Sequence, residues 1–289
     1  MNVKRDSNDE IKWDMYLRLR LIEMVTMWEG RLTTVSLTQG FGIKRQQGSR
    51  DIAFYRKQCP ENLYYCTKTR GYLPTESFSP KFTRGDIGEY LKFLSVNKDA
   101  ASYITTIEQV DTPIEILSPP NRIVDPRIVR SLIKACRNRE RIDVTYASMK
   151  NPLGEERNII PHTFVSSGYR WHLRAFCEKD RIYKDFVLGR FIGEVETIAT
   201  NIDTPEDKAW NTFIDLKIIP NPEYSDEQQQ LIAREWGMTD MCEVVTIRAA
   251  LAQYYLILMH IPYKGNYEGV RHRVILENLD VIKPYLMSS

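Results

Sequence analysis

Cationic and amide side chains gather on one side of a helical pattern between residues 45 and 57. Arginine and glutamine can donate to base edges in a DNA groove, whereas lysine and serine can bind phosphates. An ordinary solvated basic helix has the same composition, so these residues alone leave both interpretations open. We define this side as the reading face; it consists of Gln46, Ser49, Arg50, Ala53 and Lys57, flanked by Arg45 and Arg56. The opposite side is an inward stripe of Gly48, Ile52, Tyr55 and Cys59.

A second group of cations occupies alternate positions of a strand pattern at residues 169–176, with Arg170, His172 and Arg174 on one side. We call these three residues the cationic row. Because like charges in a row repel, an anion or water is expected to face them. The other side of the strand is expected to fill the core, through Tyr169, Trp171, Leu173 and Ala175. The alternative to an anion pocket is a solvated face whose arginines pair with Glu178, Asp180 or Asp185.

The reading face needs a second helix beside it. A tight turn at residues 40–42 separates a short helix from the one starting near Arg45, and Gly48 allows the two to cross closely. A supporting helix is expected at residues 10–28, ended by Gly30. Residues 62–73 predict a β-hairpin with Lys68 and Arg70 at its tip, where they either reach phosphates or only keep the loop soluble. This order of elements is that of a winged helix.

The distribution of charge also indicates that the region around the reading face contacts a polyanion. The chain has 40 Lys and Arg against 38 Asp and Glu, yet ten basic and only three acidic residues lie between Arg31 and Arg84. The remainder carries 30 basic and 35 acidic residues. A local positive excess attracts a polyanion to that part of the molecule alone.

Further elements follow along the 289 residues, a length that predicts two or three domains. A helix at 86–96 is expected to pack through Ile87, Tyr90, Leu91 and Leu94. A proline-rich connection at 111–126 leads to a helix capped by Asp125. Four or five short strands between residues 142 and 198 predict a small β-barrel, and a small α/β region follows it.

Motifs of common enzyme classes are absent: no CxxC, HExxH, Walker-A or GxSxG sequence occurs. The five cysteines are scattered, which is typical of reduced thiols. The N-terminus is polar, and the longest apolar run, 249–261, is too short to span a bilayer. We therefore predict a cytoplasmic protein with no membrane partner, no catalytic residues, no cofactor and no metal site.

Several motifs between residues 140 and 198 resemble a WYL domain, including the triplet Trp171-His172-Leu173, whose middle position departs from the namesake. Matching motifs are Tyr146-x-Ser148, 157–162, 168–175 and 185–190. Residues 42–55 and 60–65 resemble the winged helix of the BrxR/CapW type, the WYL repressors placed beside BREX and CBASS anti-phage systems. Lys44 stands where that pattern has Ser, so the helix would lack a cap worth about 1 kcal/mol.

The resemblance implies an α+β multidomain chain. Its expected parts are a winged helix-turn-helix DNA-binding domain at 1–96, a linker and connecting helix at 97–139, a WYL domain of Sm/SH3-like β-barrel fold at 140–200 and a small α/β C-terminal extension (WCX) at 201–289, which would dimerise.

The implied function is a homodimeric, sequence-specific transcriptional repressor of a phage-defence operon, relieved by an anionic nucleotide or nucleic-acid ligand. Two-fold symmetry predicts a double-stranded, inverted-repeat operator. Expected DNA-binding residues are Lys44, Arg45, Gln46, Gln47, Ser49, Arg50, Arg56, Lys57, Lys68 and Arg70. Expected ligand-binding residues, carried over by motif, are Tyr146, Ser148, His162, Arg170, His172, Arg174 and Arg190. An activator of the same architecture, or a single-stranded nucleic-acid or RNA-binding module, remain alternatives.

Overall fold

A computed structural model describes residues 11–101, 115, 117, 120, 122–200, 203–263 and 272–286. The chain divides into two compact units, Met1–Ser118 and Pro119–Ser289. Half of the proline-rich connection expected at 111–126 lies outside the described residues.

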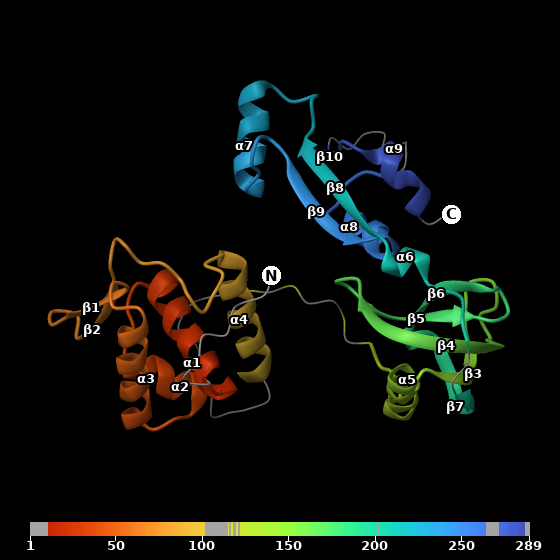
Figure 1. The fold of residues 1–289 in the computed structure, drawn as a ribbon, viewed down its shortest axis with the longest axis horizontal. Coiled ribbons are helices and arrows are strands. Elements are labelled where there is room, and N and C mark those ends of the chain that lie inside the picture. Colours follow the sequence, from red (N-terminus) through yellow and green to blue (C-terminus); the bar gives the residue numbers. More distant parts are fainter. Residues whose placement is uncertain are drawn as a thin grey trace. The chain divides into compact units, whose positions relative to one another are not determined.

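The first unit is a helix-turn-helix followed by a hairpin and a further helix (Figure 1). Gly30 and Gly42, with φ of 73° and 62°, end the first and second helical segments in the left-handed region that glycine favours. The predicted winged-helix order is confirmed. Its elements are α1 (Trp13–Met24), a π-helical turn η1 (Val25–Glu29), α2 (Thr34–Phe41), α3 (Arg45–Gln58), β1 (Leu63–Cys66), β2 (Gly71–Pro74) and α4 (Ile87–Ala101).

The crossing of α2 and α3 occurs at Gly48, as predicted. A Cβ atom there would lie 3.5 Å from the carbonyl oxygen of Thr34 and 3.6 Å from the Cβ of Leu37. The core beneath this crossing contains fully buried Leu37 and Tyr55 among other apolar side chains. Both distances are ordinary van der Waals contacts, so the helices approach closely at Gly48 and an alanine would also fit there.

Helix α4 packs along a narrower stripe than predicted. Tyr90 and Leu94 are buried with Met24, but Ile87 and Leu91 are 47% and 45% exposed. The expectation that all four residues pack inward was wrong for Ile87 and Leu91. Only the side of the helix that carries positions 90 and 94, one turn apart, faces the rest of the unit.

The second unit begins with α5 (Pro126–Asn138) and a five-stranded antiparallel sheet of order β6-β5-β4-β3-β7. The edge strands β6 and β7 do not pair with each other, so the sheet is not closed within the described residues. The predicted Sm/SH3-like barrel is not confirmed. The strands are β3 (Glu140–Tyr146), β4 (Glu155–Ser166), β5 (Trp171–Cys177), β6 (Ile182–Val187) and β7 (Phe191–Thr200), with a 3₁₀ turn η2 (Leu188–Arg190) before β7.

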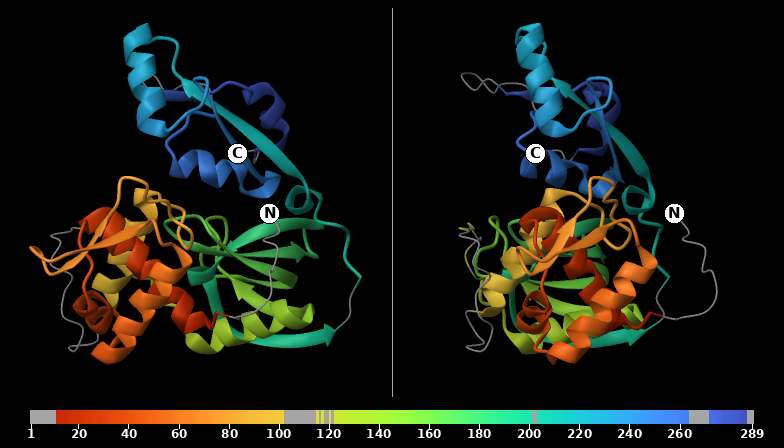
Figure 2. Two further views of the ribbon diagram at one scale, coloured as in Figure 1. Left: turned by 60° about the vertical axis from the view of Figure 1, so that its left-hand side comes forward. Right: turned by 90° about the vertical axis from the view of Figure 1, so that its left-hand side faces the viewer.

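Helix α5 covers one face of this sheet, packing on β3, β4 and β7 (Figure 2). It starts as predicted: the Asp125 carboxylate accepts the backbone N–H of Arg127 at 2.8 Å, and Pro126 takes the first helical position. Ile128 and Leu132 of α5 enter a common core with Leu173, Ala175 and Cys177 of β5. The even-numbered residues of β5 therefore face away from α5.

The C-terminal part of this unit is a small α/β region, as predicted, built on a three-stranded antiparallel sheet of order β10-β8-β9. None of the helices in the described ranges is both long and apolar enough to cross a membrane. The elements are α6 (Lys208–Asn211), β8 (Phe213–Pro220), α7 (Asp226–Trp236), β9 (Glu243–Arg248), η3 (Ala249–Leu251), α8 (Ala252–Leu258), β10 (Val274–Leu276), α9 (Leu279–Ile282) and η4 (Lys283–Tyr285).

Candidate DNA interface and cationic sheet face

The reading face of α3 is exposed along its length. Every one of its residues is exposed, whereas Gly48, Ile52 and Tyr55 on the opposite side of the same helix are buried. Lys44, Arg45, Arg56 and Lys57 are also exposed, and none of them forms an ion pair with a carboxylate in the parts of the chain that the structure describes. The helix thus separates a polar outer side from an apolar inner side.

Gln47 lies outside this exposed set. It is half-buried, and its side-chain amide donates to Asp51 at 2.9 Å. Asp51 is 1% exposed, and its other carboxylate oxygen accepts the Nε–H of Arg18 at 2.7 Å. Because Arg18 offsets the charge of Asp51 inside the unit, this carboxylate does not cancel the exposed cations of α3.

Lys44 occupies the N-cap of α3 and makes no side-chain capping hydrogen bond. Helix α2, by contrast, starts with a capping box in which Thr33 and Ser36 bond each other's backbone. Helix α3 therefore lacks a side-chain cap, as predicted, and the Lys44 side chain at its N-cap is exposed.

A fully buried carboxylate, Glu23 of α1, holds α3 in position. It accepts the hydroxyl of Tyr55 at 3.0 Å and the backbone N–H groups of Lys81, Phe82 and Thr83, each at 2.8 Å. Sequence reasoning missed this residue. The signal was a carboxylate one turn after Leu19, on the inward side of an otherwise apolar helix pattern.

The wing, which is the β1–β2 hairpin, is tied to the same helix. Asn62 donates to the Tyr55 hydroxyl at 2.8 Å, and the guanidinium of Arg56 lies 5.4 Å from the ring centre of Tyr72. At the tip, Lys68 and Arg70 are exposed. The hairpin is therefore tied to α3 at two neighbouring residues, the buried Tyr55 and the exposed Arg56 beside the reading face.

His172 and Arg174 of the cationic row are buried on β5, whereas Arg170, which precedes the strand, is half-buried. His172 and Arg174 are 2% and 5% exposed, on the side of the sheet opposite Leu173 and Ala175, which lie in the core under α5. The alternation was predicted correctly for these four residues. Tyr169 and Trp171 are 43% and 56% exposed, so their assignment to the core was wrong, because β5 begins only at Trp171 and this end of the strand projects beyond the core.

Arg174 is neutralised by carboxylates of the chain itself. It donates to Asp207 at 2.6 Å from Nε and 2.9 Å from Nη2, and to Asp185 at 3.1 Å from Nη1. The Asp185 pairing matches the alternative of internal ion pairs, whereas Asp207 was not foreseen. Burial favours the neutral acid of Asp207, but the bonds from Arg174 outweigh it and lower the Asp207 pKa. Glu178 and Asp180, the other expected partners, bind Arg141 and Arg157 instead.

His162 joins this cluster because of a β-bulge. The register of β4 with β5 shifts between Pro161 and Thr163, so the extra residue is His162. Its Nε2 lies 3.2 Å from Asp207 and its Nδ1 lies 2.8 Å from the Thr163 hydroxyl. Burial lowers the pKa of His162 more than Asp207 raises it, which favours the neutral ring.

The other half of the row has fewer partners. The His172 ring packs 5.0 Å from the ring of Tyr254 on α8, and the Tyr254 hydroxyl donates to Asp185 at 3.1 Å. Burial lowers the His172 pKa, and the nearby charges of Arg170 and Arg190 lower it further, whereas Asp185 acts in the opposite direction. The Nδ1 of His172 and the Nε of Arg170 are buried and have no hydrogen-bond partner among the described residues.

Two of the expected ligand residues lie elsewhere. Tyr146 belongs to the core under α5, packed on Phe186 and Phe191, and its hydroxyl accepts the backbone N–H of Val187 at 2.9 Å. The Ser148 hydroxyl accepts the N–H of Asn151 in a turn. The structure thus brings together five of the seven expected residues, His162, Arg170, His172, Arg174 and Arg190, and adds Asp185, Asp207 and Tyr254.

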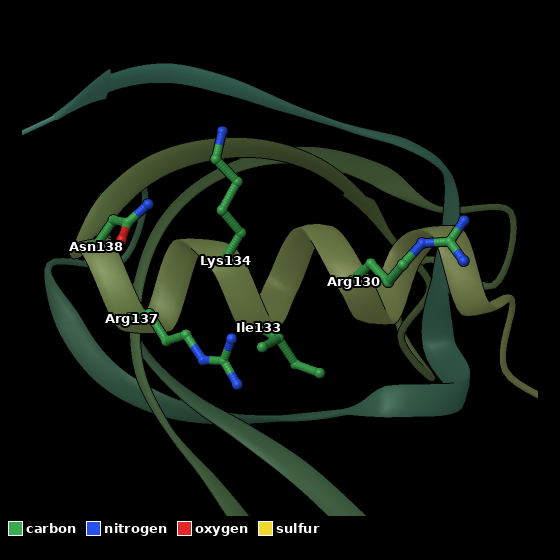
Figure 3. Close-up of a pocket in the computed structure, with 5 residues that line it drawn as sticks. All are labelled: Arg130, Ile133, Lys134, Arg137 and Asn138. Carbon is green, nitrogen blue, oxygen red and sulfur yellow. The ribbon is translucent and has the colours of Figure 1, made fainter.

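A separate open pocket of about 490 Å³ lies along α5, lined by Ile133 and four polar side chains (Figure 3). Three of them are cations, and Lys134 lies 3.6 Å from Glu140. The pocket takes no residue from the cationic row. Its polar lining residues are Arg130, Lys134, Arg137 and Asn138.

Other kinds of site are not supported. No group of three or more His, Cys, Asp or Glu residues is arranged to hold a metal ion in the described part of the chain. The five cysteines are free thiols.

Family models match three consecutive segments. Residues 14–96 match the winged helix-turn-helix domain of the BrxR transcriptional regulator, residues 127–196 match the WYL domain, and residues 213–282 match the C-terminal dimerization domain of the BrxR regulator.

Curated relatives extend over nearly the whole chain. A DNA-binding transcriptional repressor CapW of Escherichia coli (strain KTE188) is 31% identical, with 94% of this chain and 91% of that protein covered. CapW proteins of Pseudomonas aeruginosa and Stenotrophomonas maltophilia are 32% and 27% identical; they cover 94% and 98% of this chain and are themselves covered to 92% and 96%. All three carry a name that describes a non-enzymatic role.

Proposed function

This chain belongs to the family of the CapW DNA-binding transcriptional repressors, and from that premise we propose that it represses transcription by placing α3 in the major groove of operator DNA. The observation that carries the proposal is the division of α3, whose reading face is exposed and cationic while its other side is buried. Arg50 and Gln46 would donate to base edges, and Lys57 would bind a phosphate.

The same proposal includes a two-fold symmetric dimer. Its support is the match of residues 213–282 to a dimerization domain. A symmetric dimer presents two α3 helices, so the operator would be an inverted repeat with half-site centres about 10 base pairs apart, or a multiple of that. Lys68 and Arg70 on each wing would bind phosphates beside each half-site.

Selection of DNA from a random duplex pool by the full-length protein tests this function. We expect enrichment of one inverted repeat, and a complex in gel shifts that weakens steeply as salt rises. Recovery of no common sequence, or equal binding to every duplex, would overturn the proposal. Size-exclusion chromatography with light scattering of the same preparation tests the dimer.

We further propose that an anionic nucleotide or nucleic acid relieves repression by binding at Arg170, His172 and Arg190. The support is the pair of buried, unpartnered nitrogens at Arg170 and His172; the Arg170 Nε–H donates to an anion's oxygen, as does the His172 Nδ1 in the tautomer that carries its proton there. Beside them, the exposed rings of Tyr169 and Trp171 can stack on bases. Release of the operator complex by a nucleotide or a short single strand, at constant ionic strength, tests this step.

The regulated genes are proposed to form a phage-defence operon. This part rests on the resemblance to the BrxR/CapW type. The test is to locate the selected inverted repeat in the source genome and to measure transcription of the adjacent genes when this protein is deleted. An increase supports repression, and a decrease would instead identify an activator.

A single-stranded nucleic-acid module is the second candidate. The observation that favours it is the exposed pair Tyr169 and Trp171, beside the guanidinium of Arg170, which lies 4.8 Å from the Tyr169 ring centre. The double variant Arg45→Ala with Arg50→Ala separates the two sites. Loss of duplex binding with intact single-strand binding indicates two independent surfaces, and loss of both contradicts a separate site on β5.

A further inference from the structure

The Arg174 guanidinium on β5 binds a carboxylate of the chain in the way that it would bind a free anion. Its Nε and Nη2 donate to the two oxygens of a single carboxylate, that of Asp207, at 2.6 and 2.9 Å. His162 lies 3.2 Å from the same carboxylate. This side-by-side pair of bonds is the geometry with which arginine binds a phosphate or a free carboxylate.

Asp207 does not belong to the WYL sheet. It follows β7 and caps α6, where its Oδ1 also accepts the backbone N–H of Trp210 at 3.1 Å. Helix α6 in turn contacts β9, whose Arg248 guanidinium lies 4.8 Å from the Trp210 ring centre. The carboxylate on Arg174 is therefore attached to the start of the C-terminal α/β region.

The charges of this cluster decide whether a second anion can enter. Arg174 contributes one positive charge, and the buried Asp185 and Asp207 contribute two negative charges. Since burial lowers the pKa of His162, that ring adds no charge near neutral pH. With Asp207 in place these three charged groups sum to one negative charge, and the two carboxylates occupy the Nε, Nη1 and Nη2 donors of Arg174, so an external anion finds no free pair of donors there; without Asp207 the remaining two groups are balanced, and Nε and Nη2 are free.

We propose that the Arg174–His162 site binds an oxyanion, the phosphate group of the effector, and that the Asp207 carboxylate is the internal ligand that this phosphate displaces. The proposal rests on the effector relief proposed above and adds the ligand class and the responding element. When Asp207 leaves, α6 loses its cap and one of the ties between the WYL sheet and the C-terminal α/β region, while the bond from Tyr254 of α8 to Asp185 remains. Phosphate binding therefore favours a second arrangement of the C-terminal α/β region, with Asp207 released from Arg174. The size of this shift is set by the difference in phosphate affinity between the two arrangements.

Phosphate binding to full-length variants tests the displacement. Asp207→Asn removes the carboxylate charge and keeps a capping oxygen for α6. Glu206→Gln is the matched control, because Glu206 is exposed, lies one residue away and also bonds α6, through Asn211. By calorimetry with inorganic phosphate against equal ionic strength of chloride, we expect Asp207→Asn to bind at least tenfold more tightly than both the wild type and Glu206→Gln.

Equal or weaker phosphate binding by Asp207→Asn, or no binding by any variant, overturns the proposal. Asp207→Ser, which also keeps a capping oxygen, replaces Asp207→Asn where the latter does not fold. Adenosine monophosphate in a parallel titration distinguishes the source of the phosphate. Tighter binding than inorganic phosphate supports a nucleotide, and equal binding supports free phosphate as the ligand.

Hydrogen exchange of the wild type gives a second readout. Saturating phosphate should speed exchange of the amides at 208–212, since the Trp210 N–H loses its side-chain acceptor. Unchanged or slower exchange contradicts displacement. Operator release separates the proposed effector relief from the proposed role of Asp207. If Asp207→Asn binds phosphate more tightly but no nucleotide releases operator DNA, only the effector relief is contradicted. If the wild type and Asp207→Asn release operator DNA at the same nucleotide concentration, only the role of Asp207 is contradicted.

Discussion

The reading face on α3 and the cationic row on β5 carry the same kinds of side chain in opposite surroundings. Arg50 is exposed and pairs with no carboxylate in the described ranges, so its donors are available to a partner. Arg174 is 5% exposed, and Asp185 and Asp207 bind its guanidinium. Burial of a charge requires such partners, because desolvation is otherwise too costly. Accessibility and internal pairing, rather than residue type, distinguish a surface ready for a polyanion from one closed by the chain itself.

The largest effect is expected from removing the buried cation. Arg174→Met should lower the free energy of unfolding by about 3–5 kcal/mol, because Asp185 and Asp207 then remain buried without a counter-charge. Urea denaturation measures this change. Arg234→Met, at an exposed position of α7, is the control and should change stability by less than about 0.5 kcal/mol. Similar changes in the free energy of unfolding for the two substitutions would contradict the stabilising role of the buried Arg174.

Removing an exposed cation should instead affect binding. Arg50→Ala is expected to weaken operator binding by about 1–3 kcal/mol and to relax the preference at one base pair of each half-site, with little change in thermal stability. Titration of a labelled operator and of single-base variants measures both. Lys92→Ala, at an exposed position of α4 in the same unit, is the control. Unchanged affinity of Arg50→Ala would show that the reading face does not meet DNA.

Acid should destabilise the second unit selectively. Burial lowers the pKa of His162 and His172 below the ordinary value of 6.5, despite Asp207 and Asp185 nearby. Below that value the unfolded chain binds more protons than the folded one, so stability falls as the pH drops from 7 to 5. The first unit contains no histidine and lacks this contribution.

Hydrogen exchange followed at pH 7 and pH 5, after correction for the intrinsic rates, compares the two units within one protein. The His172→Asn variant should flatten the pH dependence of the second unit. An equal loss of protection in both units would contradict the assignment to the buried histidines.

The smallest expected effect concerns the start of α3. Lys44→Ser should supply the missing cap and stabilise the first unit by about 0.5–1 kcal/mol, while slightly reducing operator affinity because one exposed cation is lost. Thermal unfolding and operator titration measure the two changes. A Lys44→Ala variant controls for the loss of charge without a cap. Equal stability of the Ser and Ala variants would exclude capping.

Local patterns predicted much of the first unit. The two helices cross at Gly48, where the sequence predicted it, and α2 ends at Gly42, in the predicted turn. The inward stripe of α3 follows from helical spacing alone. Position along a helix could not show that Glu23 binds three backbone N–H groups about 60 residues later in the chain. Such a partner is set by the fold, not by spacing.

The cationic row shows the same limit on a strand. Alternation predicted which side each residue takes, but not how deeply it is buried, so Tyr169 and Trp171 were wrongly assigned to the core. The partners of the row, Asp207 and Tyr254, lie 33 and 82 residues after Arg174 and His172 and come from other elements. The β-bulge that brings His162 to Asp207 likewise has no signature in the local pattern.

The division of α3 between an outer and an inner side has a practical outcome for engineering. No residue of the reading face takes part in the contacts through Gly48, Ile52, Tyr55 or Glu23 that fix the helix in its unit. A library randomised at positions 46, 49, 50, 53 and 57, with proline and glycine left out because they weaken a helix interior, should therefore yield mostly folded proteins. Such a library could supply switches with new target sequences on one unchanged scaffold.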